Sequence, residues 1–192
     1  FPRLTRTLPN SINNVIHNFS SVQIKLYHKN HQGQDSMTDS QSNKVVQETA
    51  SDTARRVADW MYENDAATQA FGMRVEHVAP GGARLRMTVR PDMLNGHGTC
   101  HGGMIFTLAD SAFAFACNSG NALTVAQSCD IDFVNPAREG DDLIATCEER
   151  YHRGRSGIYD TAVTTADGTP VAFFRGKSRT IGGPLVGEMP ER

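Results

Sequence analysis

The chain has 192 residues, a length that suits one domain of ordinary size with or without a tail. Its 19 basic and 21 acidic residues leave a net charge of −2 at pH 7, whereas a nucleic-acid-binding protein usually carries a strong basic excess. The longest mostly apolar run, residues 104–117, is too short and too interrupted by polar residues to cross a bilayer. We therefore expect a globular protein that partners neither nucleic acid nor a membrane.

Residues 1–36 differ in composition from the rest, with four Lys or Arg and a single acid. They lack the apolar run of about 7–15 residues that a secretory signal requires. A mitochondrial transit peptide is one interpretation, because the stretch is basic and acid-poor. We favour the other, a non-native or disordered extension, because Met37 opens a plausible N-terminus. A polar segment at 37–51 is expected to follow.

The domain itself is expected over residues 52–187, with a short tail at 188–192. Its first element is predicted to be a helix over residues 52–70, with an apolar stripe that includes Val57 and Trp60. Gly72 is expected to end this helix.

Strand-like runs and one further helix make up the remainder. The second helix, from Met104 to about Ser119, is apolar nearly all round, which is typical of a helix inside a core. Turn residues separate the strand-like runs, and alternation along them predicts half-buried strands. The predicted strands are residues 73–79, 83–90, 123–133, 143–151, 157–165 and 171–181. This order favours an α+β fold, an antiparallel sheet of about six strands wrapped around a long central helix.

Asp110 is the most informative candidate residue, because it is the only ionisable group between Met104 and Cys117. An unpaired carboxylate buried on such a helix is costly. Asp110 is therefore either a helix-side acid with a hydrogen-bond partner or solvent contact, or a catalytic base or nucleophile kept partly desolvated. The residues alone leave both interpretations open.

The start of the central helix is the second candidate feature. Gly102 and Gly103 lie where loop becomes helix, and they leave backbone N–H groups uncovered at the positive end of the helix dipole. Such donors suit an anion or a developing oxyanion, although two glycines are also common where a loop leads into a helix. Asn95 and His101 lie beside them in the sequence.

The two candidate groups cannot serve one carbonyl from a single helix. Asp110 lies eight residues after Gly102, which is about 12 Å along a helix axis. A reacting carbonyl has to lie within about 3 Å of both the attacking group and the oxyanion donor. If both groups are catalytic, the active site must therefore lie across an interface in at least a dimer.

The cysteines and histidines do not predict a metal site. The chain has four cysteines, at positions 100, 117, 129 and 147. None forms a C-x-x-C pair, so we expect free thiols in a reducing compartment, the cytoplasm, rather than disulfides or structural zinc. A site built from His97, Cys100 and His101 would lack a carboxylate to complete it. We expect no metal and no other cofactor.

Positive charge gathers near the C-terminal strands. Five cations in this region are candidates for binding phosphate groups, or for a solvated strand face balanced by acids. They are Arg153, Arg155, Arg175, Lys177 and Arg179.

Several separate segments resemble one known family in order and spacing. They are residues 61–65 (MYEND), 93–97 (MLNGH), 100–103 (CHGG), 108–114 (LADSAFA) and 174–178 (FRGKS). Over residues 60–187 the chain resembles the phenylacetic acid degradation thioesterases of the hotdog fold. The resemblance implies hydrolysis of aryl-acetyl-CoA thioesters, notably phenylacetyl-CoA and its ring-hydroxylated forms. It also implies dimers that pair into tetramers.

The resemblance assigns roles to particular residues. It implies that Asp110 is the nucleophile or general base and that the Gly102 N–H polarises the thioester carbonyl. It further implies that Asn95 and His101 place the carbonyl or the water. Within the basic group, the candidates for the coenzyme A phosphates are Arg155, Arg175 and Lys177.

Two other functions remain as alternatives. One is a hotdog enoyl-CoA hydratase or dehydratase, which needs an acid-base pair that usually includes a histidine, here His101. The other is a module that binds acyl-CoA without turnover. A costly carboxylate at Asp110 argues against the binding module.

Overall fold

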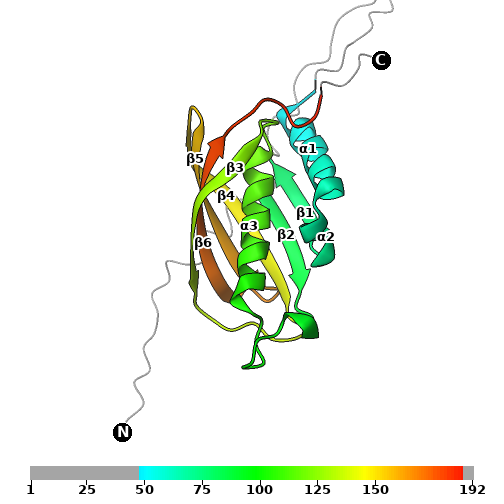
Figure 1. Cartoon of the computed structure of the whole chain (residues 1–192), viewed down its shortest axis with the longest axis vertical. Coiled ribbons are helices and arrows are strands. Elements are labelled where there is room, and N and C mark those ends of the chain that lie inside the picture. Colours follow the sequence, from blue (N-terminus) through cyan, green and yellow to red (C-terminus); the bar gives the residue numbers. More distant parts are fainter. Residues whose placement is uncertain (1–47, 188–192) are drawn as a thin grey trace, which may run out of the picture. The chain divides into compact units, whose positions relative to one another are not determined.

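The computed structural model describes residues 48–187 (Figure 1). The expectations for residues 1–36 and for the tail at 188–192 lie outside the described residues. In chain order the elements are α1 (Ala50–Asn64), α2 (Ala66–Ala70), β1 (Arg74–Ala79), β2 (Gly82–Thr88), a 3-10 turn (Pro91–Met93), α3 (Gly102–Asn118), β3 (Thr124–Phe133), β4 (Asp142–Arg153), β5 (Ser156–Thr165) and β6 (Pro170–Thr180).

The six strands form one antiparallel sheet in the order β1-β2-β4-β5-β6-β3. Figure 1 shows α3 lying along one face of this sheet, with strands on either side of it. The strands β1 and β3 are therefore the two edges. The predicted α+β layout is confirmed, and each predicted strand appears within a few residues of its expected bounds.

The central helix α3 forms the middle of the core. Its side chain Phe113 is buried and lies 5.4 Å from the Tyr159 ring and 5.8 Å from the Phe174 ring, measured between centroids. A Cβ at Gly176 would come within 2.9 Å of the Phe113 ring, so only glycine lets β6 approach the helix this closely. The helix begins at Gly102, two residues before the predicted start at Met104.

The prediction of one helix over residues 52–70 is wrong, because the structure has two helices divided at Asp65. The Asp65 carboxylate accepts hydrogen bonds from the Thr68 backbone N–H at 3.0 Å and from the Thr68 hydroxyl at 2.6 Å. The Asp65 side chain thus caps the start of α2. The backbone of Asp65 is extended, and this conformation ends α1.

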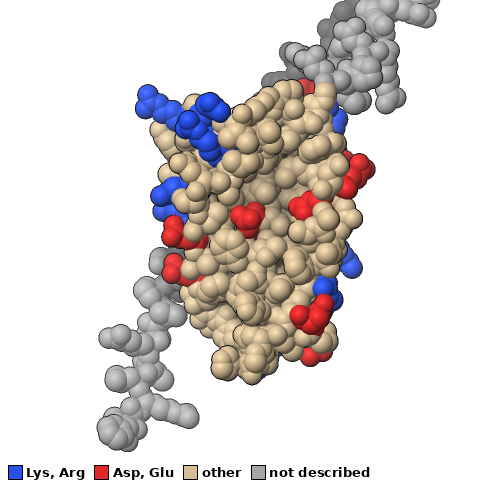
Figure 2. Space-filling view, in the orientation of Figure 1, with Lys and Arg blue, Asp and Glu red and all other residues tan. Residues whose placement is uncertain are grey.

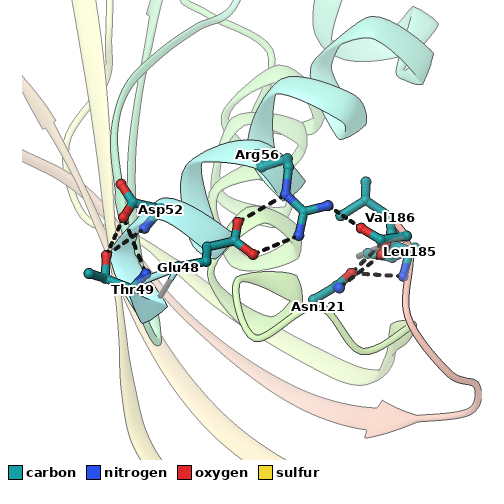
Figure 3. A network of polar contacts seen from close by, with 8 residues as sticks. Glu48, Thr49, Asp52, Arg56, Asn121, Leu185 and Val186 are labelled. Atoms are coloured by element: carbon teal, nitrogen blue, oxygen red, sulfur yellow. Dashed lines mark hydrogen bonds and ion pairs between the residues drawn. The ribbon is translucent and has the colours of Figure 1, made fainter. Parts of the chain in front are cut away.

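The first helix begins at Ala50, with a capping box in which Thr49 and Asp52 bond to each other's backbone N–H (Figure 3). Its buried residues are Ala54, Val57 and Ala58. Trp60, expected in the apolar stripe, is instead 40% exposed. Among the described helices, none is long and apolar enough to span a membrane.

Candidate active site

Asp110 lies on α3 with its carboxylate half-buried. The thiol of Cys129, on the neighbouring strand β3, donates a weak hydrogen bond to Asp110 Oδ1 at 3.8 Å. Burial raises the pKa of Asp110 above its ordinary value, and the Cys129 hydrogen bond opposes this in part. The carboxylate is consequently a stronger base than a fully solvated aspartate, as a group that accepts a proton or attacks a carbonyl requires.

The Cys129 thiol acts here as a donor and not as a nucleophile. Burial raises its pKa to about 11, with the charge of Asp110 adding to the shift. The sulfur is therefore protonated at neutral pH and keeps its hydrogen on the side of Asp110.

An apolar pocket of about 420 Å³ opens beside Asp110. Its walls come from α1, α3, the start of β3 and the segment after β6, and they include Trp60, Cys117, Val125 and Leu185. Among the described residues that line it, Asp110 carries the only charged group. Figure 2 agrees, with isolated acidic groups on a central surface that is otherwise uncharged. A lone carboxylate at an apolar pocket suits a substrate with an apolar group next to an electrophilic carbon.

The N-terminus of α3 presents a free backbone donor. His101 caps the helix, and its Nδ1 accepts a hydrogen bond from the Gly103 N–H at 2.9 Å. The Gly102 N–H has no acceptor among the described residues. A Cβ at Gly102 would lie 3.1 Å from the Phe133 ring, so glycine also lets that ring pack over the helix start. The free donor at the positive end of α3 is available to a developing oxyanion.

Asn95 shapes the loop in front of α3. Its side-chain carbonyl accepts from the backbone N–H of His97 at 2.9 Å and of Thr99 at 3.3 Å, and its amide donates to the Thr99 hydroxyl at 3.0 Å. These bonds fold the loop back on itself, as an Asx turn does. Among the described residues, no three His, Cys, Asp or Glu side chains lie close enough together to hold a metal ion.

One chain does not bring the two central candidates together. Gly102 and Asp110 lie on the same uninterrupted helix, so they remain about 12 Å apart along its axis. The edge strand β3 runs beside this interval, because Cys129 contacts Asp110 and Phe133 covers Gly102. The site as predicted from the sequence is therefore split between two places along one face of α3.

None of the candidate phosphate-binding cations lines the pocket, and Arg175 and Lys177 alternate along β6 with buried residues, so they point away from α3. Arg175 donates two hydrogen bonds to Asp160, at 2.7 and 2.9 Å, and this pair lowers the pKa of Asp160. The Arg155 guanidinium donates to the Thr180 carbonyl at 2.7 Å, and Lys177 is exposed. Figure 2 shows basic side chains gathered at one end of the molecule. The charge of Arg175 is therefore compensated within the chain, whereas Arg155 has no acid partner among the described residues.

Sequence reasoning missed Cys129 as a neighbour of Asp110. Simple alternation along residues 123–133 could not reveal it, because an irregularity between Ala126 and Ser128 changes which side chains of β3 face the helix. It also missed Asn121, whose contacts with the C-terminal segment depend on where that segment runs.

Comparison with known proteins places the chain in a family. The sequence pattern of the Thioesterase superfamily matches residues 97–172. The chain is 48% identical over 128 residues to "Acyl-coenzyme A thioesterase PaaI" of Escherichia coli K12, an alignment that covers 67% of this chain and 91% of that protein. The chain belongs to the PaaI-type acyl-coenzyme A thioesterases of the thioesterase superfamily.

Solved structures of the family agree with this assignment. The structure of the E. coli PaaI protein, from the phenylacetic acid degradation operon, superposes with a TM-score of 0.71 at 45% identity, covering 72% of this chain and 100% of that chain. A variant of the phenylacetic acid degradation protein PaaI from Thermus thermophilus gives a TM-score of 0.57 at 38% identity, covering 61% of this chain and 100% of that one. The predicted family, its hotdog fold and its class, thioester hydrolase, are confirmed.

Proposed function

We propose that this thioesterase hydrolyses aryl-acetyl-CoA thioesters, phenylacetyl-CoA and its ring-hydroxylated forms, to the free acid and coenzyme A. The observation that carries the proposal is Asp110, a single half-buried carboxylate of raised pKa beside an apolar pocket. The identity to a protein named as an acyl-CoA thioesterase supports the thioester as substrate. We place the reaction in aromatic catabolism in the cytoplasm, in keeping with four free cysteines.

Asp110 begins the reaction in one of two ways. It attacks the thioester carbonyl itself, or it takes a proton from a water that attacks. In both routes the carbonyl oxygen gains negative charge, the C–S bond breaks and coenzyme A leaves as thiol, and water supplies the oxygen of the free acid. The apolar pocket receives the acyl group while the coenzyme A part stays outside.

The Gly102 N–H stabilises the oxyanion in this scheme. It is a donor without a partner among the described residues, at the positive end of α3. His101 Nδ1 is occupied as an acceptor, so the second ring nitrogen carries the hydrogen and is able to hold a water or the carbonyl. Asn95 assists by fixing the loop that carries these groups.

The complete site requires a second copy of the chain. The strand β3 is an edge of the sheet, and its apolar side chains Val125 and Phe133 are 39% and 52% exposed. An exposed edge strand of this kind is a template for pairing with another strand. We propose that two copies pair through β3, and that such dimers associate into tetramers.

The register of that pairing follows from the contacts of β3 with α3. Cys129 marks the level of Asp110 and Phe133 marks the level of Gly102, four residues or about 13 Å apart along the strand. Antiparallel pairing centred on Ile131 puts Cys129 opposite the partner subunit's Phe133. Asp110 then lies at the level of the partner subunit's Gly102, which assembles two equivalent sites.

The coenzyme A phosphates are assigned to Arg155, Arg175 and Lys177. Support comes from the exposure of all three side chains, which leaves them accessible to a phosphate group. Arg155 and Lys177 are the stronger candidates, because Asp160 already neutralises Arg175.

A free-thiol assay with phenylacetyl-CoA tests the proposed function. We expect steady release of coenzyme A by the wild-type protein and its loss in Asp110→Asn. Turnover of a trans-enoyl-CoA without thiol release would instead identify a hydratase, and tight binding without any turnover would identify a binding module. Either result would refute the proposal.

A further inference from the structure

The pocket extends along α3 away from Asp110. Its lining on that helix runs from Asp110 through Ala114 to Asn118, about 12 Å along the axis. An acyl group whose carbonyl lies at Asp110 therefore points toward the C-terminal end of α3. Whatever closes that end limits the length of the acyl group.

The far end of the pocket is lined by Leu185, which belongs to a segment that follows β6. We name residues 183–187 the C-terminal strap. Its start is fixed beside Leu123, because the Leu123 N–H donates to the Gly183 carbonyl at 2.8 Å. Leu123 lines the pocket too, so the strap runs along the pocket wall and not away from it.

Asn121 holds the C-terminal strap with its whole side chain (Figure 3). Its Oδ1 accepts from the N–H groups of Leu185 at 2.9 Å and Val186 at 3.0 Å, and its Nδ2 donates to the Val186 carbonyl at 3.0 Å. Its backbone has a φ of 57°, a left-handed conformation that asparagine tolerates better than most residues. These bonds attach the strap to Asn121, which lies three residues after the end of α3.

A second anchor ties the C-terminal strap to α1. The Arg56 guanidinium bonds both carboxylate oxygens of Glu48 at 3.0 Å and also donates to the Gly187 carbonyl (Figure 3). The strap is thus held at both ends by elements that themselves form pocket walls. Segments held in this way act as fixed walls, whereas chain ends without such bonds are usually loose.

We propose that the C-terminal strap is the end wall of the acyl pocket, that Leu185 sets the longest acyl group accepted, and that Asn121 is the positioning residue that holds this wall. The inference rests on the proposed function, because it takes the pocket's occupant to be the acyl group of an acyl-CoA. It assigns to the site short aryl-acetyl and medium-length acyl groups, and excludes long-chain acyl groups.

Substitutions at Leu185 test the wall through substrate length. We compare kcat/KM for phenylacetyl-, hexanoyl-, octanoyl-, decanoyl- and dodecanoyl-CoA. Leu185→Ala should extend the accepted length, with a gain of about four-fold for each methylene newly buried. Leu185→Trp should move the limit to shorter chains. Val186→Ala is the matched control, because its side chain lies on the same strap but does not line the pocket.

Asn121→Gly tests the positioning role. Glycine keeps the left-handed backbone without strain, while the three side-chain hydrogen bonds to the strap are lost. We expect the length limit to relax as in Leu185→Ala, with KM for long acyl-CoAs falling and kcat for phenylacetyl-CoA little changed. A merely structural role would instead lower the rates with all substrates in the same proportion.

Binding gives a readout that does not depend on turnover. Trp60 is the only tryptophan of the chain and lines the pocket, so its fluorescence reports occupancy in an Asp110→Asn background. Affinity for decanoyl-CoA should rise when Leu185→Ala is added. Unchanged length limits in Leu185→Ala, Leu185→Trp and Asn121→Gly, in kinetics and in binding, would overturn the strap proposal. If the wild type releases no thiol but affinity still follows Leu185, the proposed hydrolysis fails and the strap proposal stands.

Discussion

The two ends of α3 use their polar groups in opposite ways. At the C-terminal end, Asn118 bonds both the N–H and the carbonyl of Thr124, and the Ser119 hydroxyl accepts from the Gly81 N–H at 2.8 Å. At the N-terminal end, the Gly102 N–H has no acceptor among the described residues. Hydrogen bonds of this kind stabilise the fold. An end that keeps a donor free is available for a substrate, and Asp110 lies between the two.

The largest expected effect comes from Asp110→Asn, midway between the two ends of α3. The amide keeps the size of the side chain but neither accepts a proton nor attacks a carbonyl. We expect kcat to fall about 10²- to 10⁴-fold, the range for loss of a general base, while affinity for phenylacetyl-CoA is retained. Steady-state rates and Trp60 fluorescence measure the two quantities. A variant within tenfold of wild type would remove Asp110 from the mechanism.

The N-terminal end of α3 is tested by Gly102→Pro, which removes the free backbone N–H of Gly102. Gly102 is the first residue of α3, where proline is well tolerated, and the extended His101 backbone suits a following proline. We expect kcat to fall about 10²- to 10³-fold, as for loss of one oxyanion donor.

Gly102→Ala is the matched control for that substitution. It presents a similar Cβ to the Phe133 ring but keeps the N–H. The alanine variant should therefore be markedly more active than the proline variant. Equal losses in the two would assign the effect to crowding of Phe133 and not to the donor.

A substitution at the C-terminal end of α3 should affect stability and not activity. Ser119→Ala leaves the Gly81 N–H without its buried partner, so we expect the free energy of unfolding to fall by about 1–3 kcal/mol. Denaturant unfolding measures this, and kcat per folded molecule should stay near wild type. A large loss of kcat with unchanged stability would contradict the division between the two ends.

The smallest expected effect concerns the acid limb of the pH-rate profile. The Cys129 thiol donates to ionised Asp110 and so lowers its pKa, in opposition to the larger effect of burial. Removing that donor in Cys129→Ala should raise the pKa of Asp110 further, so activity is lost at a higher pH as the solution is acidified. Cys129→Ser, which keeps a donor, should leave the limb close to the wild-type position. A shift of the limb to lower pH in Cys129→Ala would contradict the assigned hydrogen bond.

Patterns within single segments predicted most of the fold. Alternation located the strands, and the all-round apolar character of residues 104–119 placed α3 in the core, because both depend on which faces are buried. The break at Asp65 was missed because a side-chain cap competed with helix propagation at one residue.

The candidate site was predictable only in part, for a physical reason. Asp110 and Gly102 are candidates that local sequence suggests, and their separation follows from helix geometry alone. The contact of Cys129 with Asp110 depends on how β3 lies against α3. The hydrogen bond between Asn121 and Leu185 joins residues 64 positions apart. Such contacts between distant segments leave no periodic trace in the sequence.

Each active site is proposed to combine Asp110 of one subunit with Gly102 of another. Asp110→Asn and Gly102→Pro homodimers should each be inactive, because every site lacks one group. Unfolding and re-annealing an equal mixture makes about half of the dimers mixed by random pairing, each with one intact and one doubly damaged site. We predict recovery of about a quarter of wild-type activity. If both variants fold and mixed dimers form but no activity returns, the two groups act within one chain and the claim is wrong.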